Sequence, residues 1–384
     1  MANILIRGPL LTQSGYGVHS RQIFRWAKSR GHNVSVSLTP WGITPWYVNS
    51  LDLSGMVGSI MQATNPDSVK PDISFQIQLP NEWDPNLCRQ NIGVTAGVET
   101  NICNPKWVEQ CKKMTKVIVP TTFTAKTFEV SGYSECKVIP ETYYDSCAES
   151  ESLKLDRITK LPTKKNFLLF GQITGENSQL DRKNTWDSVA CFIDTFKKHA
   201  DVGLIIKTNS GTNCKMDLRV TERRLTNFLS KIRPKNCKAK IYMLHGYLNN
   251  KEIAGLYKSK KVIGLISGTR GEGFGLPLLE AAVSGLPVIA TDWSGHKDFL
   301  DRGEWLAVEN KLVPVAAAKI DGNIFVPGSQ WAQIDKGDFS KNLIRLYKNP
   351  SFYRKKAKSL STKLKSEFGF ESIAVKYDEL MRNL

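Results

Sequence analysis

Short apolar runs alternate with amphipathic stretches along almost the whole chain, and this alternation limits the folds that it can adopt. Runs such as 3–8 and 116–120 have the length and composition of buried strands, and 17–31 has the periodicity of a helix. Parallel strands joined by helices on both faces of a sheet produce this pattern. The sequence therefore predicts an α/β fold built from doubly wound, Rossmann-like sheets.

The length of 384 residues favours two domains over one. The stretch 147–165 is polar, rich in charge and without aromatic residues, as interdomain linkers often are. We therefore expect an N-terminal lobe at 1–155, a C-terminal lobe at 156–365, and a C-terminal helix at 366–384 that packs back on the N-terminal lobe.

Targeting signals and long apolar segments are not found in the sequence. The longest apolar runs are far shorter than the roughly 20 residues that a membrane helix needs. The eight cysteines include no C-x-x-C pair and are expected to be reduced thiols. The five histidines include no pair with helical i, i+4 spacing, so no metal site is predicted. These features favour a cytoplasmic protein.

The net charge of +17 is concentrated in the second part of the chain. Residues 1–150 carry 13 Lys/Arg and 12 Asp/Glu, whereas the rest carry 40 and 24, a surplus of 16. Any one basic cluster is readily explained as a solvated surface. The sum predicts attraction to polyanions, whether nucleic acid, anionic lipid or sugar phosphate.

The segment 268–288, GTRGEGFGLPLLEAAVSGLPV, places two acids, Glu272 and Glu280, around a glycine-rich turn. Pro277 is suited to the first turn of a helix and Gly285 to its end. Backbone amides at the start of that helix would form an anion site. The expected amides are those of Gly273, Phe274, Gly275 and Leu276.

An acid next to an anion site repels phosphate but accepts hydrogen bonds from sugar hydroxyls. The combination therefore fits a nucleotide-sugar, with the diphosphate at the amides and a carboxylate for each sugar ring. A capped helix with one surface glutamate explains the same spacing, and spacing alone leaves both interpretations open.

The residues themselves resemble the donor site of retaining GT-B glycosyltransferases of family 4. Glu272 and Glu280 match the E-x7-E motif of that family. The segments VIVPTTFTAKTF, VIPETYYD and HGYLNNKEIAGLYKSKKVIGLIS are similar to other parts of its pattern. The resemblance covers most of 110–384, is most specific at 267–296, and is weak over 1–105. It implies a GT-B fold, with two Rossmann-like lobes facing across a cleft.

The resemblance implies a role for each matching residue. Glu272 would approach the hydroxyls of the donor sugar, Glu280 the ribose, and the amides of 273–276 the diphosphate. Gln172 stands where the family usually has an arginine, so we assign the cationic role to Arg182 and Lys183. The chain has no D-x-D triplet. We therefore expect a metal-independent reaction with no cofactor besides the nucleotide-sugar, which is UDP-type by the resemblance.

The first loop, RGPLLTQSGYGVHSRQI, corresponds to the glycine-rich loop of the family. Gly15 and Gly17 would allow the backbone to approach the diphosphate. His19 is a candidate catalytic residue or an ordinary packing residue of the helix. Glu99, the acid at the end of a predicted strand, is a candidate for contact with the acceptor.

Three acceptors compete. A nucleic-acid hydroxyl, such as a hydroxymethylated DNA base, is favoured by the basic surplus and by the aromatic residues of 39–49. A glycolipid or polysaccharide at the membrane is the main alternative, with peripheral membrane contact. A small metabolite or protein hydroxyl is the third. A binding module without catalysis and a sugar-nucleotide epimerase stay open as other functions of the fold.

Overall fold

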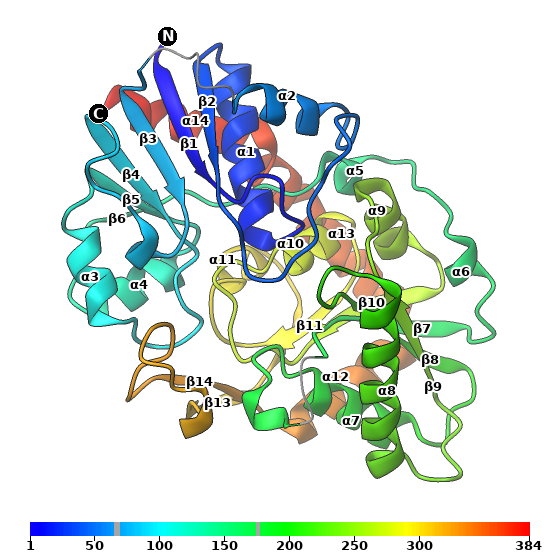
Figure 1. Cartoon of the computed structure of the whole chain (residues 1–384). Coiled ribbons are helices and arrows are strands. Elements are labelled where there is room, and N and C mark those ends of the chain that lie inside the picture. The colour runs from blue at the N-terminus through cyan, green and yellow to red at the C-terminus, as the bar shows by residue number, and fades with distance from the viewer. Residues whose placement is uncertain (65–69, 174–176) are drawn as a thin grey trace. The chain divides into compact units, whose positions relative to one another are not determined.

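The computed structural model describes residues 1–64, 70–173 and 177–384, shown in Figure 1. The chain forms two compact units. Unit 1 comprises Met1–Thr142, Asp321–Ser329 and Phe370–Leu384, and unit 2 comprises Tyr143–Ile320 and Gln330–Gly369. The predicted boundary at 155/156 differs from the observed change of unit at 142/143. The reason is that Tyr143, which precedes the polar stretch, and Cys147, its first residue, are both buried in the core of unit 2.

Unit 1 is built on a six-stranded parallel sheet with the order β2-β1-β3-β4-β5-β6. The strands are β1 (Asn3–Gly8), β2 (Asn33–Leu38), β3 (Ile73–Ile77), β4 (Gln90–Val94), β5 (Lys116–Val119) and β6 (Cys136–Val138). The helices are α1 (Gly15–Ser29), α2 (Met56–Gln62), α3 (Pro105–Cys111), α4 (Thr122–Val130) and α14 (Phe370–Arg382), with a 3-10 turn η1 (Pro80–Glu82).

The C-terminal helix α14 is part of unit 1 although its sequence follows unit 2. Its Ile373 and Tyr377 are buried in the same core as the side chains of α1. The rings of Tyr377 and Trp26 lie 5.0 Å apart, and the indole of Trp26 donates a 2.8 Å hydrogen bond to Asp378. Aromatic packing, this partly buried hydrogen bond and the ion pairs of Arg30 with Asp378 and Glu371 therefore hold this helix in place.

Unit 2 is built on a second six-stranded parallel sheet, with the order β12-β11-β10-β7-β8-β9. The strands are β7 (Lys165–Phe170), β8 (Val202–Thr208), β9 (Lys240–His245), β10 (Val262–Ser267), β11 (Val288–Thr291) and β12 (Leu306–Val308). The next two strands, β13 (Asn310–Pro314) and β14 (Gln330–Ile334), form a separate antiparallel sheet.

Helices cover both faces of this sheet (Figure 1). They are α5 (Asp145–Ala148), α6 (Asp156–Thr159), α7 (Thr185–Phe196), α8 (Lys215–Ile232), α9 (Asn250–Lys258), α10 (Leu276–Val283), α11 (Lys297–Leu300), α12 (Lys336–Lys348) and α13 (Pro350–Glu367), with 3-10 turns η2 (Ser178–Leu180) and η3 (Ala317–Lys319). Leu168 is buried among side chains of α9, α10 and α13, whereas its neighbours Phe167 and Leu169 are buried among those of α7 and α12. This alternation is the two-residue period of a strand buried on both faces.

The predicted doubly wound α/β fold is confirmed. In unit 2 the strand order reverses between β7 and β10, so the loops that follow these two strands lie at the switch point of the sheet. Ligands of such sheets bind at the carboxyl ends of the strands at this point. Within the described ranges, no helix combines the length and the apolar character needed to cross a membrane.

Candidate active site

Two loops meet at the switch point of unit 2, one after β7 and one after β10. Arg182 and Lys183 lie in the first loop, and Glu272 in the second. Residues 174–176, which lie between Gln172 and Arg182, are outside the described residues. The carboxylate of Asp181 accepts a 2.6 Å hydrogen bond from the amide of Thr185 and so caps the first turn of α7. This cap fixes the end of the first loop.

Arg270, a buried residue of the loop after β10, is hydrogen-bonded to the loop after β7. Its guanidinium donates to the carbonyl oxygen of Asp181 at 3.1 Å, and its amide donates to the carbonyl oxygen of Arg182 at 2.9 Å. Asn184 adds a 2.9 Å hydrogen bond to the carbonyl oxygen of Gly268. Because each contact involves main-chain atoms, the relative position of the two loops is fixed by the backbone.

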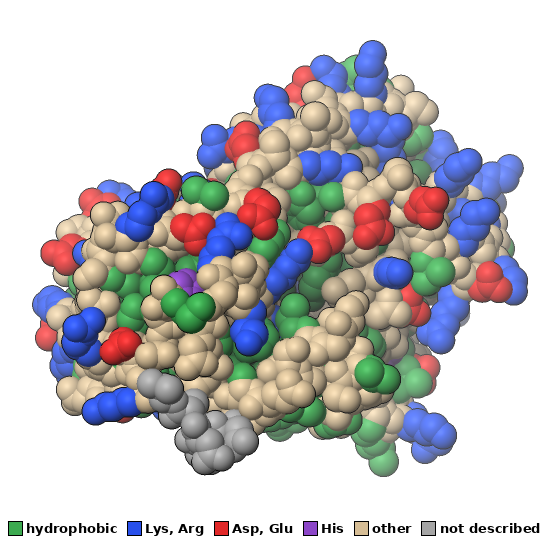
Figure 2. Space-filling view, turned by 90° about the horizontal axis from the view of Figure 1, so that it is seen from above, with side chains coloured by type: hydrophobic (Ala, Val, Ile, Leu, Met, Phe, Trp, Pro, Cys, Tyr) green, Lys and Arg blue, Asp and Glu red, His purple; other side chains and the backbone are tan. Residues whose placement is uncertain are grey.

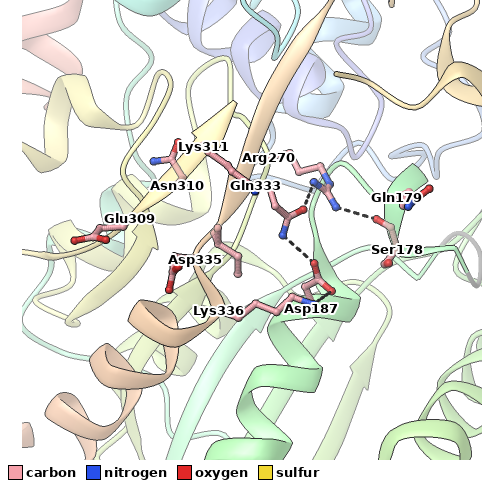
Figure 3. Close-up of a pocket in the computed structure, with 11 residues that line it drawn as sticks. Ser178, Gln179, Asp187, Arg270, Glu309, Asn310, Lys311, Gln333, Asp335 and Lys336 are labelled. Atoms are coloured by element: carbon pink, nitrogen blue, oxygen red, sulfur yellow. Dashed lines mark hydrogen bonds and ion pairs between the residues drawn. The ribbon is translucent and has the colours of Figure 1, made fainter. Parts of the chain in front are cut away.

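A cavity of about 590 Å³ adjoins Arg270 on the side of β13 and β14 (Figure 3). Its polar groups are largely occupied with one another. Arg270 donates to the carbonyl oxygen of Ser178 at 3.2 Å and to Gln333, Gln333 donates to Asp187 at 3.1 Å, and Lys336 pairs with Asp187 at 2.9 Å. We interpret this network as support for the loop that carries Glu272.

The buried carboxylate of Glu272 forms an ion pair with the partly buried ammonium of Lys183. The ammonium of Lys183 lies 2.7 Å from both carboxylate oxygens, and the guanidinium of Arg182 lies 3.8 Å from one of them. Burial alone would raise the pKa of Glu272, which is 7% exposed, but Lys183 and Arg182 bring this pKa down to about 2. The carboxylate is therefore ionised at every physiological pH. The structure thus brings together three residues that the sequence singled out separately.

The second loop leads into α10 with its backbone amides directed to one end of the helix. Gly275 has a φ of 99°, in the left-handed region that favours glycine, and Pro277 is the second helical residue. No acceptor among the described residues takes a hydrogen bond from the amides of Phe274, Gly275 or Leu276. These amides are three of the four that the sequence predicted as an anion site.

A third loop, after β11, supports this turn and was not found from the sequence. The amide of Glu272 donates a 2.9 Å hydrogen bond to the hydroxyl of Ser294, and the amide of Gly295 donates to the carbonyl oxygen of Glu272 at 2.9 Å. A Cβ atom at Gly295 would lie 2.2 Å from the carbonyl oxygen of Gly273. The two backbones are therefore packed so closely that only glycine fits.

His296 of the same loop is fully buried behind Glu272. Its Nε2 atom lies 2.7 Å from the carbonyl oxygen of Thr291, and its Nδ1 atom 3.4 Å from the hydroxyl of Ser294. Burial lowers the pKa of this imidazole, and the hydrogen bond to Thr291 and the charge of Glu272 offset only part of this lowering. The imidazole is therefore neutral near pH 7, and both of these contacts are to residues at the end of β11 and in the loop that follows.

Glu280 has a different environment from Glu272. It is 5% exposed, and one of its carboxyl oxygens accepts a 3.2 Å hydrogen bond from the hydroxyl of Tyr257 in α9. Burial raises the pKa of Glu280 to about 8, with a small opposite effect of this hydrogen bond. The sequence interpretation of two carboxylates therefore needs a correction, because Glu280 is largely protonated near pH 7.

His19 is buried in unit 1, and its Nε2 atom lies 3.3 Å from the hydroxyl of Tyr377 in α14. Burial lowers the pKa of His19 to about 4, so the ring is neutral at pH 7. These observations match the packing interpretation of this residue, one of the two that the sequence left open.

The helix after the first loop begins two residues earlier than expected, and the approach of Gly15 and Gly17 to a diphosphate stays a prediction. Helix α1 begins at Gly15, with Ser14 as its cap, rather than at Gly17. A Cβ atom at Gly17 would lie 2.3 Å from the carbonyl oxygen of Thr12, whereas one at Gly15 would meet nothing within 4 Å. The close approach at Gly17 is therefore made by its own loop.

Glu99 is half-buried in the loop that follows β4, and its charge contributes to a raised pKa of the Tyr16 phenol, after the larger effect of burial. Tyr16 stacks on Trp41 with ring centroids 3.8 Å apart. Of the aromatic residues that the sequence suggested for base stacking, Tyr47 is buried and Trp46 is 40% exposed. The expectation of an exposed aromatic surface at 39–49 is thus met by Trp46 but not by Tyr47.

Further polar groups lie at the carboxyl ends of β8 and β9. Lys207 is buried and donates 2.6 Å hydrogen bonds to the side chain of Asn209 and to the carbonyl oxygen of Gly246. Burial lowers the pKa of this ammonium to about 8. The signal available in the sequence was a lysine as the last residue but one of an apolar strand.

Comparison with known proteins adds an independent observation. The family model described as glycosyl transferases group 1 matches residues 229–324, which include Glu272 and Glu280. This match confirms the prediction of a glycosyltransferase. The comparison with curated proteins found no match.

Solved structures show the fold over the full length. Sucrose-phosphate synthase from Thermosynechococcus elongatus is 14% identical, with a TM-score of 0.65 over 100% of this chain and 99% of that chain. Anabaena Alr3699/HepE in complex with UDP and glucose is 12% identical, with a TM-score of 0.65 over 100% of both chains. The UDP-forming α,α-trehalose-phosphate synthase from Burkholderia vietnamiensis is 10% identical, with a TM-score of 0.62 over 100% of both. The predicted GT-B fold is confirmed; the family 4 type and the stereochemical course stay predictions.

Proposed function

We propose that this glycosyltransferase moves a sugar from a UDP-type nucleotide-sugar to an acceptor hydroxyl with retention and without a metal ion. The observation that carries the proposal is the Lys183–Glu272 ion pair, next to the open amides at the start of α10. Both lie at the switch point of the sheet, where ligands of this fold class bind.

Lys183 and the amides of 274–276 supply positive charge for a diphosphate. A bound diphosphate competes with Glu272 for the ammonium of Lys183, since both are anions. Glu272 stays ionised because its pKa is about 2 with its cations in place, and a carboxylate accepts hydrogen bonds from sugar hydroxyls. The ion pair therefore holds both groups ready for a donor.

Glu280 is proposed to contact the ribose. Because its pKa is raised to about 8, it meets a ribose hydroxyl at pH 7 as a neutral carboxylic acid, which donates a hydrogen bond as well as accepting one. Tyr257 occupies one of its oxygens, which orients the carboxyl group.

The reaction breaks the bond between the anomeric carbon and the diphosphate oxygen, and the electron pair leaves with the diphosphate. The acceptor oxygen forms its bond on the same face of the sugar, through an oxocarbenium-like transition state. The leaving phosphate oxygen takes the proton of the acceptor hydroxyl. This sequence needs no protein nucleophile, and Arg182, Lys183 and the helix amides stabilise the leaving charge.

For the acceptor we propose a hydroxymethylated base in DNA. The surplus of 16 positive charges beyond residue 150 supports a polyanionic acceptor. A base in a duplex must also be extruded before its hydroxyl can react. A membrane glycolipid is the alternative that the experiment must separate.

The test is mass spectrometry after incubation with mixed UDP- and GDP-sugars. The acceptors are an oligonucleotide containing 5-hydroxymethylcytosine, its unmodified counterpart, and a vesicle-bound glycolipid. The proposal predicts gain of one sugar by the modified oligonucleotide alone. Transfer to the glycolipid alone refutes the DNA acceptor, and no turnover of any donor supports a binding module. Conversion of the donor sugar without transfer identifies an epimerase.

A further inference from the structure

Unit 2 contains a large basic groove that the donor site does not use. The groove has a volume of about 1070 Å³ and is lined by eight Lys or Arg residues against one acid, Glu149. Along one wall runs helix α13, which contributes Arg354, Lys355, Lys358 and Lys365. Figure 2 shows Lys and Arg side chains gathered toward the upper and right edges of one face of the molecule.

The groove lies at the amino ends of the strands in the sheet of unit 2. Lys164 immediately precedes β7, and Lys260 precedes β10. Gly285, between α10 and β11, lines the same groove. The loops with Lys183 and Glu272 follow the carboxyl ends of β7 and β10, so the two sites lie at opposite edges of one parallel sheet. The groove is therefore separate from the donor site.

The cations of the groove fall into two sets. The first set donates hydrogen bonds to backbone carbonyl oxygens. Arg354 donates to those of Val262 and Gly285 at 2.7 and 3.2 Å, and Lys258 to those of Ser146 and Glu149 at 2.6 and 2.7 Å. Lys165 and Lys365 donate to those of Tyr347 and Ala148, each at 3.0 Å. Burial, together with the nearby charge of Lys365, lowers the pKa of Lys258.

The second set is exposed and without an anionic partner. In the part of the chain that the structure describes, no carboxylate lies within ion-pair distance of its members, which are Lys164, Lys260, Lys355 and Lys358. Four unpaired cations around one concave surface repel one another, and an anion bound among them relieves this repulsion.

We propose that the groove binds the phosphodiester backbone of nucleic acid. Its lining adds the hydroxyls of five serines and one threonine to the cations, and both cationic and hydroxyl side chains contact phosphate oxygens in protein–DNA complexes. The concave shape fits a chain of phosphates, and the residues that line the groove offer no large apolar face for insertion into a bilayer. Few apolar side chains line the groove, among them Ile263 and Val283, so the contact is with the backbone and is independent of base sequence.

This inference stands on the groove and not on the transfer reaction. If the acceptor is a DNA base, the groove holds a part of the same polymer away from the reacting base. If the acceptor is another hydroxyl, the groove still binds nucleic acid. DNA binding measured without a nucleotide-sugar therefore tests the groove separately from the transfer reaction.

The test compares two double charge reversals of the full chain. Lys355→Glu/Lys358→Glu removes two exposed cations of the groove. Lys235→Glu/Lys238→Glu changes the same charge at two exposed lysines of unit 2 that do not line it. Fluorescence anisotropy with a labelled 20-nucleotide DNA lacking modified bases, single-stranded and duplex, gives the Kd over a series of salt concentrations.

We expect the groove variant to weaken binding at least about tenfold and to lower the slope of log Kd against log salt by about 2, because two phosphate contacts are lost. The control variant should change the Kd and the salt slope far less. An equal loss in the two variants overturns the proposal, because the effect then comes from net charge. The proposal also fails if the wild type does not bind DNA, or if only binding to phosphatidylserine vesicles responds to the groove variant. Circular dichroism spectra and donor turnover identical to those of the wild type exclude misfolding as a cause.

Discussion

Removing the cation from the buried pair tests the electrostatics of the site most sharply. In Lys183→Met, Glu272 keeps its burial but loses the ammonium 2.7 Å from both of its oxygens. Burial raises the pKa of Glu272, and Lys183 and Arg182 together lower it to about 2, a net stabilisation of the charged form of about 3 kcal/mol at ~1.4 kcal/mol per pKa unit. We expect the free energy of unfolding of unit 2 at pH 7.5 to fall by about 3 kcal/mol, as for a buried pair that loses one partner.

The pH dependence gives the sign of the effect. In the wild type the depressed pKa means that the stabilisation is complete above pH 4.5 and is lost as the pH falls toward 2. In Lys183→Met, burial raises the pKa above 4.5, so stability is lost as the pH rises through the new value. The difference between the two proteins should therefore grow from pH 4.5 to pH 8.

The measurement is a urea titration of the full chain at each pH, with unfolding of unit 2 followed by pulsed hydrogen exchange of its peptides. The double variant Lys183→Met/Glu272→Gln should remove the growing difference. Lys160→Met, which breaks the exposed pair with Asp156 at 2.8 Å, is the matched control and should show none. A difference that is constant between pH 4.5 and 8 refutes the reasoning.

Three further predictions follow from single residues. Glu280→Gln should become more stable relative to the wild type as the pH rises from about 5 to about 8. The reason is that the pKa of Glu280, raised to about 8, makes the wild type lose stability over this range. Parallel plots of the free energy of unfolding against pH for the two proteins contradict this. Gly17→Ala should lower the free energy of unfolding of unit 1 by about 2 kcal/mol, because the added Cβ would lie 2.3 Å from the carbonyl oxygen of Thr12. Gly15→Ala should change it little. Equal shifts of the Tm in the two variants argue against a close contact at Gly17. As the pH falls from 6.5 to 4, His19→Gln should lose less stability than the wild type, because burial lowers the pKa of the His19 ring to about 4. A constant difference in the free energy of unfolding across this range rules out a buried, neutral His19.

The fold and half of the candidate site could be predicted because they depend on local sequence. The alternation of strands and helices follows from residue type and periodicity, and both sheets were expected. The turn at 272–277 follows from Gly275, which has a φ of 99°, and from Pro277 in the first helical turn. These features need no knowledge of distant residues.

The remaining features depend on contacts between residues far apart in the sequence. Lys183 and Glu272 are 89 positions apart, and only the adjacency of β7 and β10 brings them together. Glu280 is protonated because α9 and the apolar core surround it, which its helix position does not reveal. Likewise, Cys147 lies in a polar stretch that looked like a linker, yet it is buried in the core.

The most direct test of the central claim is the formation of free nucleotide diphosphate from a set of nucleotide-sugars, with the acceptor panel present. We expect the wild type and Lys160→Met to form UDP. We expect at least ~100-fold slower UDP formation by Lys183→Met, because a charge-assisted contact to the leaving phosphate is lost. UDP formation at the same rate by Lys183→Met, or no turnover of any nucleotide-sugar by the wild type, would contradict a donor site at Lys183 and Glu272.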